Sequence, residues 1–320
     1  MKITKKITLF ETCENEIKIS EKIRDIPYFF LYFSPVKNHT PLKISDIDEY
    51  FLESSEILEN KDYVIIYKEK QLYSTFYVFF ERLMNPREKI RFFLDSYVYL
   101  LKAIDILNSN GIVCFDINDE KIGFNQKKQP ILHDFSKSFY IGDGFHVLDR
   151  VLSRHTPESF TLPLETHILT FVNQKLKKKE RISQTNIEDI CREFIVKNQA
   201  LRGFSHEFIK KYFNMCVLQG LSFSLINEPR ENIFEKLLPH AKTWDNYSVS
   251  ALFLPLLAQI QVNEESTPFF DGFTQLLLLN MNPNPEKRLT PKQSIDKLED
   301  LFIEWDNISN FKIFTQDLSS

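Results

Sequence analysis

Two aspartates that flank a short hairpin pattern constrain this chain more than any other feature. Asp116 and Asp134 lie 18 residues apart. Between them, apolar residues 122–124 and 130–132 enclose the polar stretch 125–129, a pattern that predicts two strands joined by a turn. An antiparallel hairpin brings its two ends together, so we expect the two carboxylates to lie close in space.

Two carboxylates on a rigid hairpin suit phosphoryl transfer, in which one orients a hydroxyl and the other holds Mg²⁺. Cys114-Phe115-Asp116 stands where protein kinases have His-Arg-Asp, and Asp134-Phe135-Ser136 where they have Asp-Phe-Gly. The chain therefore resembles protein kinases, and most of all the serine/threonine kinases of large nucleocytoplasmic DNA viruses. The resemblance implies that Asp116 is the catalytic base and Asp134 the metal ligand.

Composition is consistent with an intracellular protein. The 320 residues, 43% of them hydrophobic, can bury a large core, and a net charge of −4 provides no general basic surface for nucleic acid. No apolar run reaches the roughly 18 residues of a membrane span. The four cysteines have no paired spacing, which favours reduced thiols. We expect a cytoplasmic protein, in host cytoplasm or virion if it is viral, without nucleic-acid or membrane partners.

Glycine is scarce, and this scarcity bears on nucleotide binding. The chain has seven glycines, and the first is Gly111. Kinases cover the ATP phosphates with a G-x-G-x-x-G loop near the start of the domain, where missing side chains let backbone N–H groups approach the phosphates. This chain cannot form that loop.

The N-terminal part resembles a reduced kinase N-lobe. Residues 5–10 read as a strand and 13–26 as a helix, which would match the third kinase strand and the helix after it, with strands one and two absent. Lys6 is the nearest candidate for the nucleotide-holding lysine and Glu16 for its helical partner; the alternative is that both are solvated surface residues. Two further strands are expected at residues 63–67 and 71–80.

The remaining chain is predicted to be helical. A helix begins at Asn85-Pro86, follows apolar spacing and stops near Gly111, directly before the catalytic-loop candidate. Other helices are expected at residues 186–198, 205–221, from 244 onward through an apolar run containing Pro255, from 267 to 279, and from 290 to 302.

Three residues resemble the structural supports of a kinase. Residues 154–158 (Arg-His-Thr-Pro-Glu) resemble the end of an activation segment, so the resemblance pairs Glu158 with Arg288. Asp245 stands where kinases have an aspartate that hydrogen-bonds the catalytic-loop backbone. Residues 163–167 (Pro-Leu-Glu-Thr-His) match an element of the insertion found in the related viral kinases.

Two substitutions affect the catalytic loop itself. Lys121 occupies the position where the resemblance expects an Asn that binds the second Mg²⁺, and Asn118 replaces the lysine that contacts the transferred phosphate. An ammonium at position 121 is a candidate internal substitute for the second metal, if it points inward rather than into solvent. Both changes weaken phosphoryl transfer, because the protein contributes positioning and charge there.

These observations predict an α+β, protein-kinase-like bilobal fold with a reduced N-lobe sheet at residues 1–83. A mainly helical C-lobe would span 84–320, with an insertion at about 159–243. Two functions fit: a pseudokinase, or degenerate serine/threonine kinase, that acts through a protein partner; or a weakly active serine/threonine kinase with a protein substrate. ATP and Mg²⁺ are the cofactors that the resemblance implies, and the substitutions argue against both.

Overall fold

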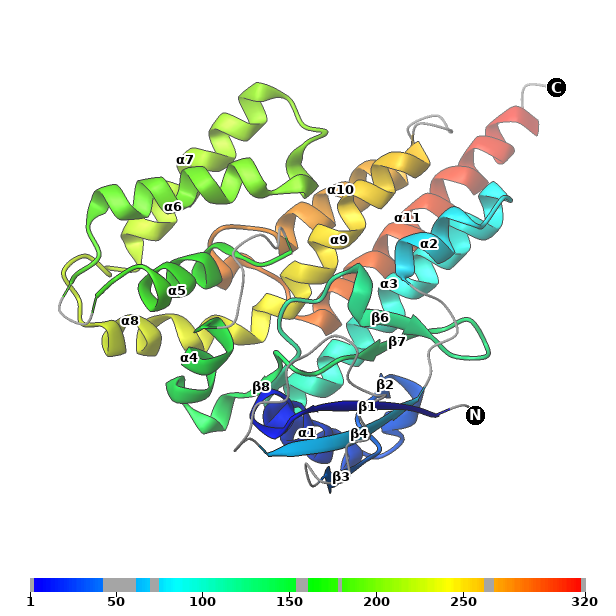
Figure 1. Ribbon diagram of the computed structural model, residues 1–320. Helices are drawn as coiled ribbons and strands as arrows, with labels where there is room; N and C mark the ends of the chain where they lie inside the picture. The colour runs from blue at the N-terminus through cyan, green and yellow to red at the C-terminus, as the bar shows by residue number, and fades with distance from the viewer. Residues whose placement is uncertain are drawn as a thin grey trace.

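The computed structural model describes residues 3–42, 62–69, 75–153, 161–177, 180–261 and 268–317. Over these ranges the chain is α+β, with small sheets near the N-terminus followed by a mainly helical part (Figure 1). The predicted boundary near residue 83 falls in the short link between helix α2 (Phe76–Glu81) and helix α3 (Pro86–Ser109). Residues 154–158, which resemble the end of an activation segment, lie outside the described ranges.

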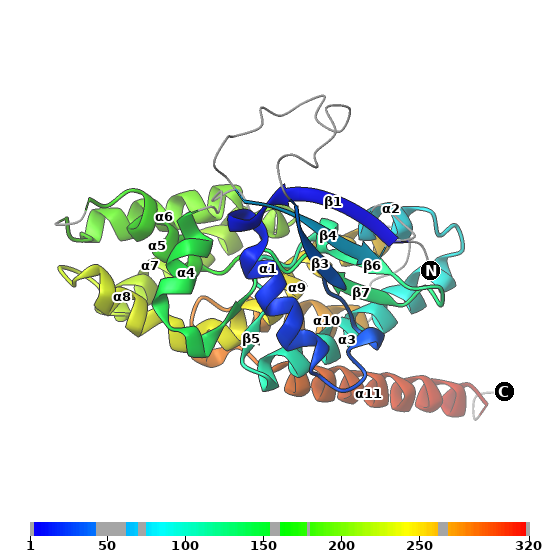
Figure 2. The ribbon, with the colours of Figure 1, turned by 60° about the horizontal axis from the view of Figure 1, so that its bottom comes forward.

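The N-terminal sheet packs one face against a single helix. Its antiparallel strands are β1 (Ile3–Leu9), β4 (Tyr63–Glu69) and β3 (Asn38–Leu42), in that spatial order. Helix α1 (Phe10–Arg24) follows β1 directly and runs beneath the strands in Figure 2. Val64 and Ile66 form a small core with residues of α1. Because strand side chains alternate between faces, Lys68 also points toward α1.

The predicted hairpin is confirmed. Strands β6 (Ile122–Phe124) and β7 (Pro130–His133) pair antiparallel, and β2 (Phe33–Ser34) joins β7 in parallel. Outside the hairpin, β5 (Ile112–Val113) pairs with β8 (Phe139–Tyr140). The segments that carry Asp116 and Asp134 are therefore held between two paired strand sets.

The helical part is built around α3 and the apolar helix α9 (Trp244–Gln261). Phe253 of α9 packs against Phe93 and Tyr97 of α3, with ring centroids 5.0 and 5.2 Å apart. None of the helices within the described ranges has the length and apolar character needed to cross a membrane. The other helices are α4 (Phe145–Ser153), α5 (Leu164–Gln174), α6 (Gln184–Lys197), α7 (His206–Ser222), α8 (Arg230–Leu237), α10 (Pro268–Asn280) and α11 (Pro291–Asp317).

The strand predicted at residues 71–80 is wrong over its described part, which is the helix α2. Thr75 caps this helix by accepting a hydrogen bond from the Val78 backbone N–H. Phe76, Phe79 and Phe80 are buried, and their spacing is that of one helical face rather than of alternating strand positions. The strand was predicted because this segment is rich in aromatic residues, which are common in strands.

This correction can be tested at two neighbouring positions. Phe79 is 5% exposed and stacks near Phe124 at 4.5 Å, whereas Val78 is 36% exposed. Phe79→Ala should lower the free energy of unfolding by about 3–5 kcal/mol, and Val78→Ala by less than about 1 kcal/mol. Urea unfolding of both variants measures the difference. A larger loss of unfolding free energy at Val78 than at Phe79 would favour the strand over the helix.

Candidate functional site

The two aspartates lie on unusual backbone. Phe115, Asp116 and Asp134 have φ values of 58°, 57° and 58°, in the left-handed region. Aspartate tolerates this region, but for a bulky residue such as phenylalanine it is a genuine outlier. Such conformations persist only where surrounding contacts impose them, and they concentrate at functional sites.

The backbone around Phe115 is held by opposite charges on its two sides. The buried Asp245 carboxylate accepts the N–H of Cys114 at 2.7 Å and that of Phe115 at 2.9 Å, which confirms the predicted role of Asp245. The Lys121 ammonium donates to the Phe115 carbonyl at 2.8 Å. Lys121 is itself buried, so the alternative of a solvated Lys121 is excluded. A carboxylate and an ammonium thus fix one peptide segment together.

Burial raises the pKa of the Asp245 carboxyl from 3.8 to about 6, although the two backbone hydrogen bonds and Lys121 favour its charged form. Desolvation is the larger effect because no part of this side chain reaches water. The Asp245 carboxylate therefore takes up a proton at a higher pH than an exposed aspartate would.

Asp116, the expected catalytic base, is enclosed rather than open. Asp116 is only 2% exposed to solvent. One carboxylate oxygen is 2.7 Å from the Lys137 ammonium, and the other lies 3.4 Å from the Thr161 hydroxyl. Sequence reasoning missed Lys137, whose only signal was its position three residues after Asp134 on the far side of the hairpin.

Asp134 is half-buried and remains strongly acidic. Burial raises its pKa, but hydrogen bonds from Ser136 and the nearby ammonium groups of Lys121 and Lys68 outweigh this effect and lower the pKa below 3.8. The predicted influence of Lys121 on Asp134 is therefore present. The carboxylate is ionised and already compensated by fixed cations.

Glu16 forms the predicted type of ion pair, but with a different lysine. Its carboxylate is 2.5 Å from the ammonium of Lys68 on β4, so the predicted Lys6–Glu16 pair is wrong. Lys6 lies exposed on β1. It stands opposite Ile66 in the register and so shares the α1-facing side of the sheet with Lys68. Strand position alone could not show which of the two lysines reaches the helix.

Helix α1 also contacts the segment after Asp134. Asn15 donates its side-chain amide to the carbonyls of Ser136 at 3.0 Å and Ser138 at 2.7 Å. These carbonyls flank Lys137, so two neighbouring residues of one helix, Asn15 and Glu16, contact the segments that carry Lys137 and Lys68. No local pattern around Asn15 predicts this contact.

The residues do not fit the two-metal arrangement that the resemblance implies. Asn118 caps a short helical turn by accepting the N–H of Glu120 at 3.1 Å, and Lys121 offers an ammonium in place of an oxygen ligand. Magnesium requires oxygen ligands in near-octahedral geometry. Within the described part of the chain, no three His, Cys, Asp or Glu side chains gather as a metal-binding set.

Arg288 forms a buried ion pair with Glu165 of α5. Its guanidinium binds Glu165 through two hydrogen bonds of 2.8 Å, and both side chains are fully buried. Glu158, the partner that the resemblance predicts for Arg288, lies outside the described residues. The signal was present in Pro163-Leu164-Glu165, a proline-containing segment that ends in glutamate.

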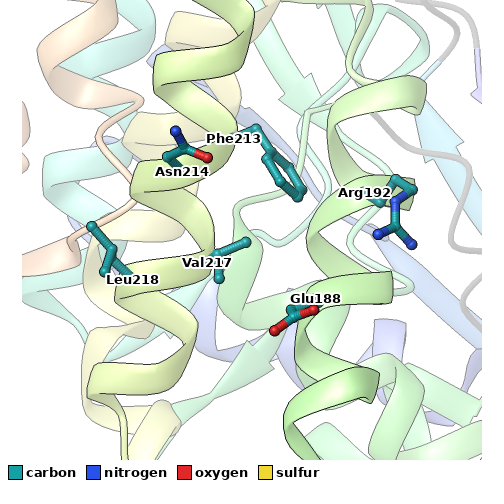
Figure 3. Close-up of a pocket in the computed structure, with 6 residues that line it drawn as sticks. All are labelled: Glu188, Arg192, Phe213, Asn214, Val217 and Leu218. Carbon is teal, nitrogen blue, oxygen red and sulfur yellow. The ribbon is translucent and has the colours of Figure 1, made fainter.

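A concavity lies between α6 and α7, within the predicted insertion (Figure 3). Its volume is about 430 Å³. Its walls are mostly apolar on α7, with one acid and one base on α6. The lining residues are Glu188, Arg192, Phe213, Asn214, Val217 and Leu218. Neither of the two aspartates lines it, so the groove is separate from the site described above.

The buried Glu165–Arg288 pair gives a stability prediction. Glu165→Gln should lower the free energy of unfolding by about 3–5 kcal/mol, because it leaves the Arg288 charge uncompensated in the interior. Glu207→Gln is the matched control, because this carboxylate on α7 is 77% exposed, and it should change the free energy of unfolding by less than about 0.5 kcal/mol. Chemical denaturation of both variants measures the difference; equal losses at both positions would contradict the buried Glu165–Arg288 pair.

Asp245 gives a prediction for pH dependence. Its pKa is higher in the folded chain, about 6, than the ordinary 3.8, so the folded chain binds the proton more tightly than the unfolded chain. Its contribution to stability is therefore greatest below pH 4 and decreases as the pH rises toward 6. Relative to Asp245→Asn, the unfolding free energy of the natural chain should fall by about 3 kcal/mol over this window. Parallel stability curves for the two proteins would contradict the assignment.

Comparison of the chain with protein-family models gives no match, and comparison with curated proteins gives none either.

Proposed function

We propose that this chain is a protein-kinase-like protein that acts as a pseudokinase, through binding of a protein partner rather than through phosphoryl transfer. Several contacts support kinase-like organisation. A strand leads directly into a helix whose Glu16 pairs with a sheet lysine, as in the kinase ion pair. Asp245 holds the loop before Asp116, and Arg288 forms a buried pair with a glutamate far away in sequence.

The burial and the contacts of the Asp116 carboxylate are the main support for the proposed loss of phosphoryl transfer. A catalytic base must lie within hydrogen-bond reach of the hydroxyl that it deprotonates. In this chain the Asp116 carboxylate is buried, with one oxygen against the Lys137 ammonium and the other beside the Thr161 hydroxyl. A substrate hydroxyl would have to displace these groups before it could transfer its proton.

Lys121, at the expected metal-binding position, and the missing glycine loop also support loss of phosphoryl transfer. Lys121 cannot ligate a metal ion while it is charged, and its ammonium already donates to the Phe115 carbonyl. No glycine precedes Gly111, so a glycine-rich phosphate loop cannot form in the N-terminal part. Together these features weaken the positioning and the charge neutralisation on which phosphoryl transfer depends.

The alternative is a weakly active serine/threonine kinase, with Asp116 as base and Asp134 as metal ligand. The Glu16–Lys68 ion pair favours it, because the corresponding pair must form in active kinases. Lys137 also returns a positive charge to the neighbourhood of Asp116, where Asn118 had removed one.

Phosphate transfer from labelled ATP distinguishes the two functions. The purified chain should show no autophosphorylation and no transfer to a protein substrate with Mg²⁺ or Mn²⁺. Lys121→Asn should not restore transfer, because the glycine loop is still missing and the Lys137 ammonium still forms an ion pair with the Asp116 carboxylate.

The control is Asp116→Asn, which removes the candidate base. Measurable autophosphorylation by the natural chain that disappears in this variant would establish the active kinase and overturn the pseudokinase proposal.

A further inference from the structure

We infer that the free edge of β1 binds an extended, acidic segment of a partner protein, which adds to the N-terminal sheet as a further strand. β1 forms one edge of this three-stranded sheet, because β4 lies between β1 and β3 (Figure 2). The inference goes beyond the proposed function, since it assigns a surface and a class of partner. Peptide binding and phosphate transfer are measured separately, so either can fail without the other.

The register of the sheet shows which backbone groups of β1 face away from β4. The N–H of Phe10 donates to the carbonyl of Asp62 at 2.9 Å, so these two opposite residues form a hydrogen-bonded pair. Such pairs recur at every second residue of an antiparallel ladder, which assigns Thr4, Lys6 and Thr8 to hydrogen bonds with β4. The N–H and C=O groups of the alternate residues point toward the free edge. These residues are Ile3, Lys5 and Ile7.

These free backbone groups select an extended chain as their ligand. They recur every two residues, roughly 6.6–6.8 Å along β1, which is the repeat of a second strand. Apart from the ladder with β4, no hydrogen bond among the described residues involves the backbone of Ile3, Lys5 or Ile7. A helix satisfies its own backbone groups, so a helical partner could not pair with this edge.

Two adjacent lysines make the edge basic. Lys5 and Lys6 are both exposed and project from opposite faces of the sheet, so an added strand would meet positive charge on each face. The Lys5 ammonium lies 5.6 Å from the centroid of the Tyr67 ring. Over the described ranges, neither lysine forms an ion pair with a carboxylate. Acidic side chains on the added strand would therefore pair with charges that are not already compensated.

The face of β1 turned away from α1 adds apolar contact. Ile3 and Ile7 flank Lys5 on this face, because alternate strand residues share a face. Ile3 is 53% exposed, and Ile7 stands half-buried opposite Ile65 of β4. Apolar residues of an added strand would cover both isoleucines. The edge therefore favours a segment in which two adjacent acidic residues follow alternating apolar and polar residues.

The lysines disfavour a second copy of the chain as the occupant. Antiparallel pairing of two β1 strands through the same free backbone groups, centred on Lys5, places the Lys5 side chains of the two copies opposite each other. Like charges directly opposite each other destabilise a strand pair. Lysine on an edge strand is a common protection against such self-association, and the same charge favours an acidic strand.

Fluorescence anisotropy with a labelled peptide tests the inference. The probe is Val-Thr-Val-Glu-Glu-Thr-Val, whose two glutamates stand opposite Lys6 and Lys5 when its third residue pairs antiparallel with Ile7. This acidic peptide should bind, and the same peptide with lysines in place of its glutamates should bind about tenfold more weakly or not at all. Equal binding of the two peptides, or no binding of the acidic one, would overturn the inference.

Backbone methylation of the probe tests whether binding uses the strand edge. N-methylation of the acidic peptide at the residues opposite Ile7 and Lys5 removes the donors that face β1 and leaves the side chains unchanged. The methylated peptide should not bind. Binding equal to that of the unmodified peptide would show that the backbone is not recognised and would contradict strand addition.

Charge reversal on β1 locates the binding surface. The double change Lys5→Glu and Lys6→Glu should weaken binding of the acidic peptide about tenfold and strengthen binding of the lysine peptide. Lys210→Glu with Lys211→Glu is the matched control, since it reverses two adjacent exposed lysines on α7. The control should bind both peptides as the natural chain does; a loss equal to that of the β1 variant would mean that binding follows net charge.

Amide hydrogen exchange of the natural chain needs no variant and decides the matter if the β1 variant does not fold. Without peptide, the N–H groups of Lys5 and Ile7 should exchange faster than those of Lys6 and Thr8, which bond to β4. The acidic peptide should slow exchange at Lys5 and Ile7. Unchanged exchange there with peptide bound would place the peptide elsewhere. Self-association of the chain that protects the same groups would identify a second copy as the occupant and would also overturn the inference.

Discussion

The left-handed backbone at Phe115 is the constraint on which the rest of the site depends. A bulky residue in this conformation costs about 1–3 kcal/mol. Asp245 and Lys121 offset that cost from opposite sides, with charge-assisted hydrogen bonds to the N–H and the carbonyl of the same residue. The Phe115 ring packs edge-on against Phe139 and Trp244, with centroids 6.1 Å away in each case. This combination turns Asp116 toward Lys137.

Lys121 therefore has two roles that a neutral amide could not combine. It holds the Phe115 carbonyl, and together with the Ser136 hydrogen bond and Lys68 it lowers the pKa of Asp134. A buried lysine is expensive unless opposite charges surround it, and Asp245 and Asp134 provide them. The charge at position 121 is thus part of the folded structure, not an addition to it.

Much of the fold could be predicted because its signals are local. The hairpin and α3 follow from apolar spacing with polar or glycine stops, and Asp245 was identified from the residues around it. The partners of Glu16 and Arg288 could not be predicted in this way. Each partner lies far away in the sequence, 52 residues for Lys68 and 123 for Glu165, and several charged residues competed for the role. Lys137 was missed for the same reason, since only the folded hairpin brings it to Asp116.

The charges of the site are paired across separate segments of the chain. Electrostatic attraction depends on distance in space, so a lysine on β4 serves Glu16 as well as one on β1 would. Helix α1 contacts Lys68 of β4 through Glu16, and it contacts the backbone on both sides of Lys137 through Asn15. Lys137 in turn contacts Asp116. The position of α1 and the charges around the two aspartates are therefore coupled by direct contacts.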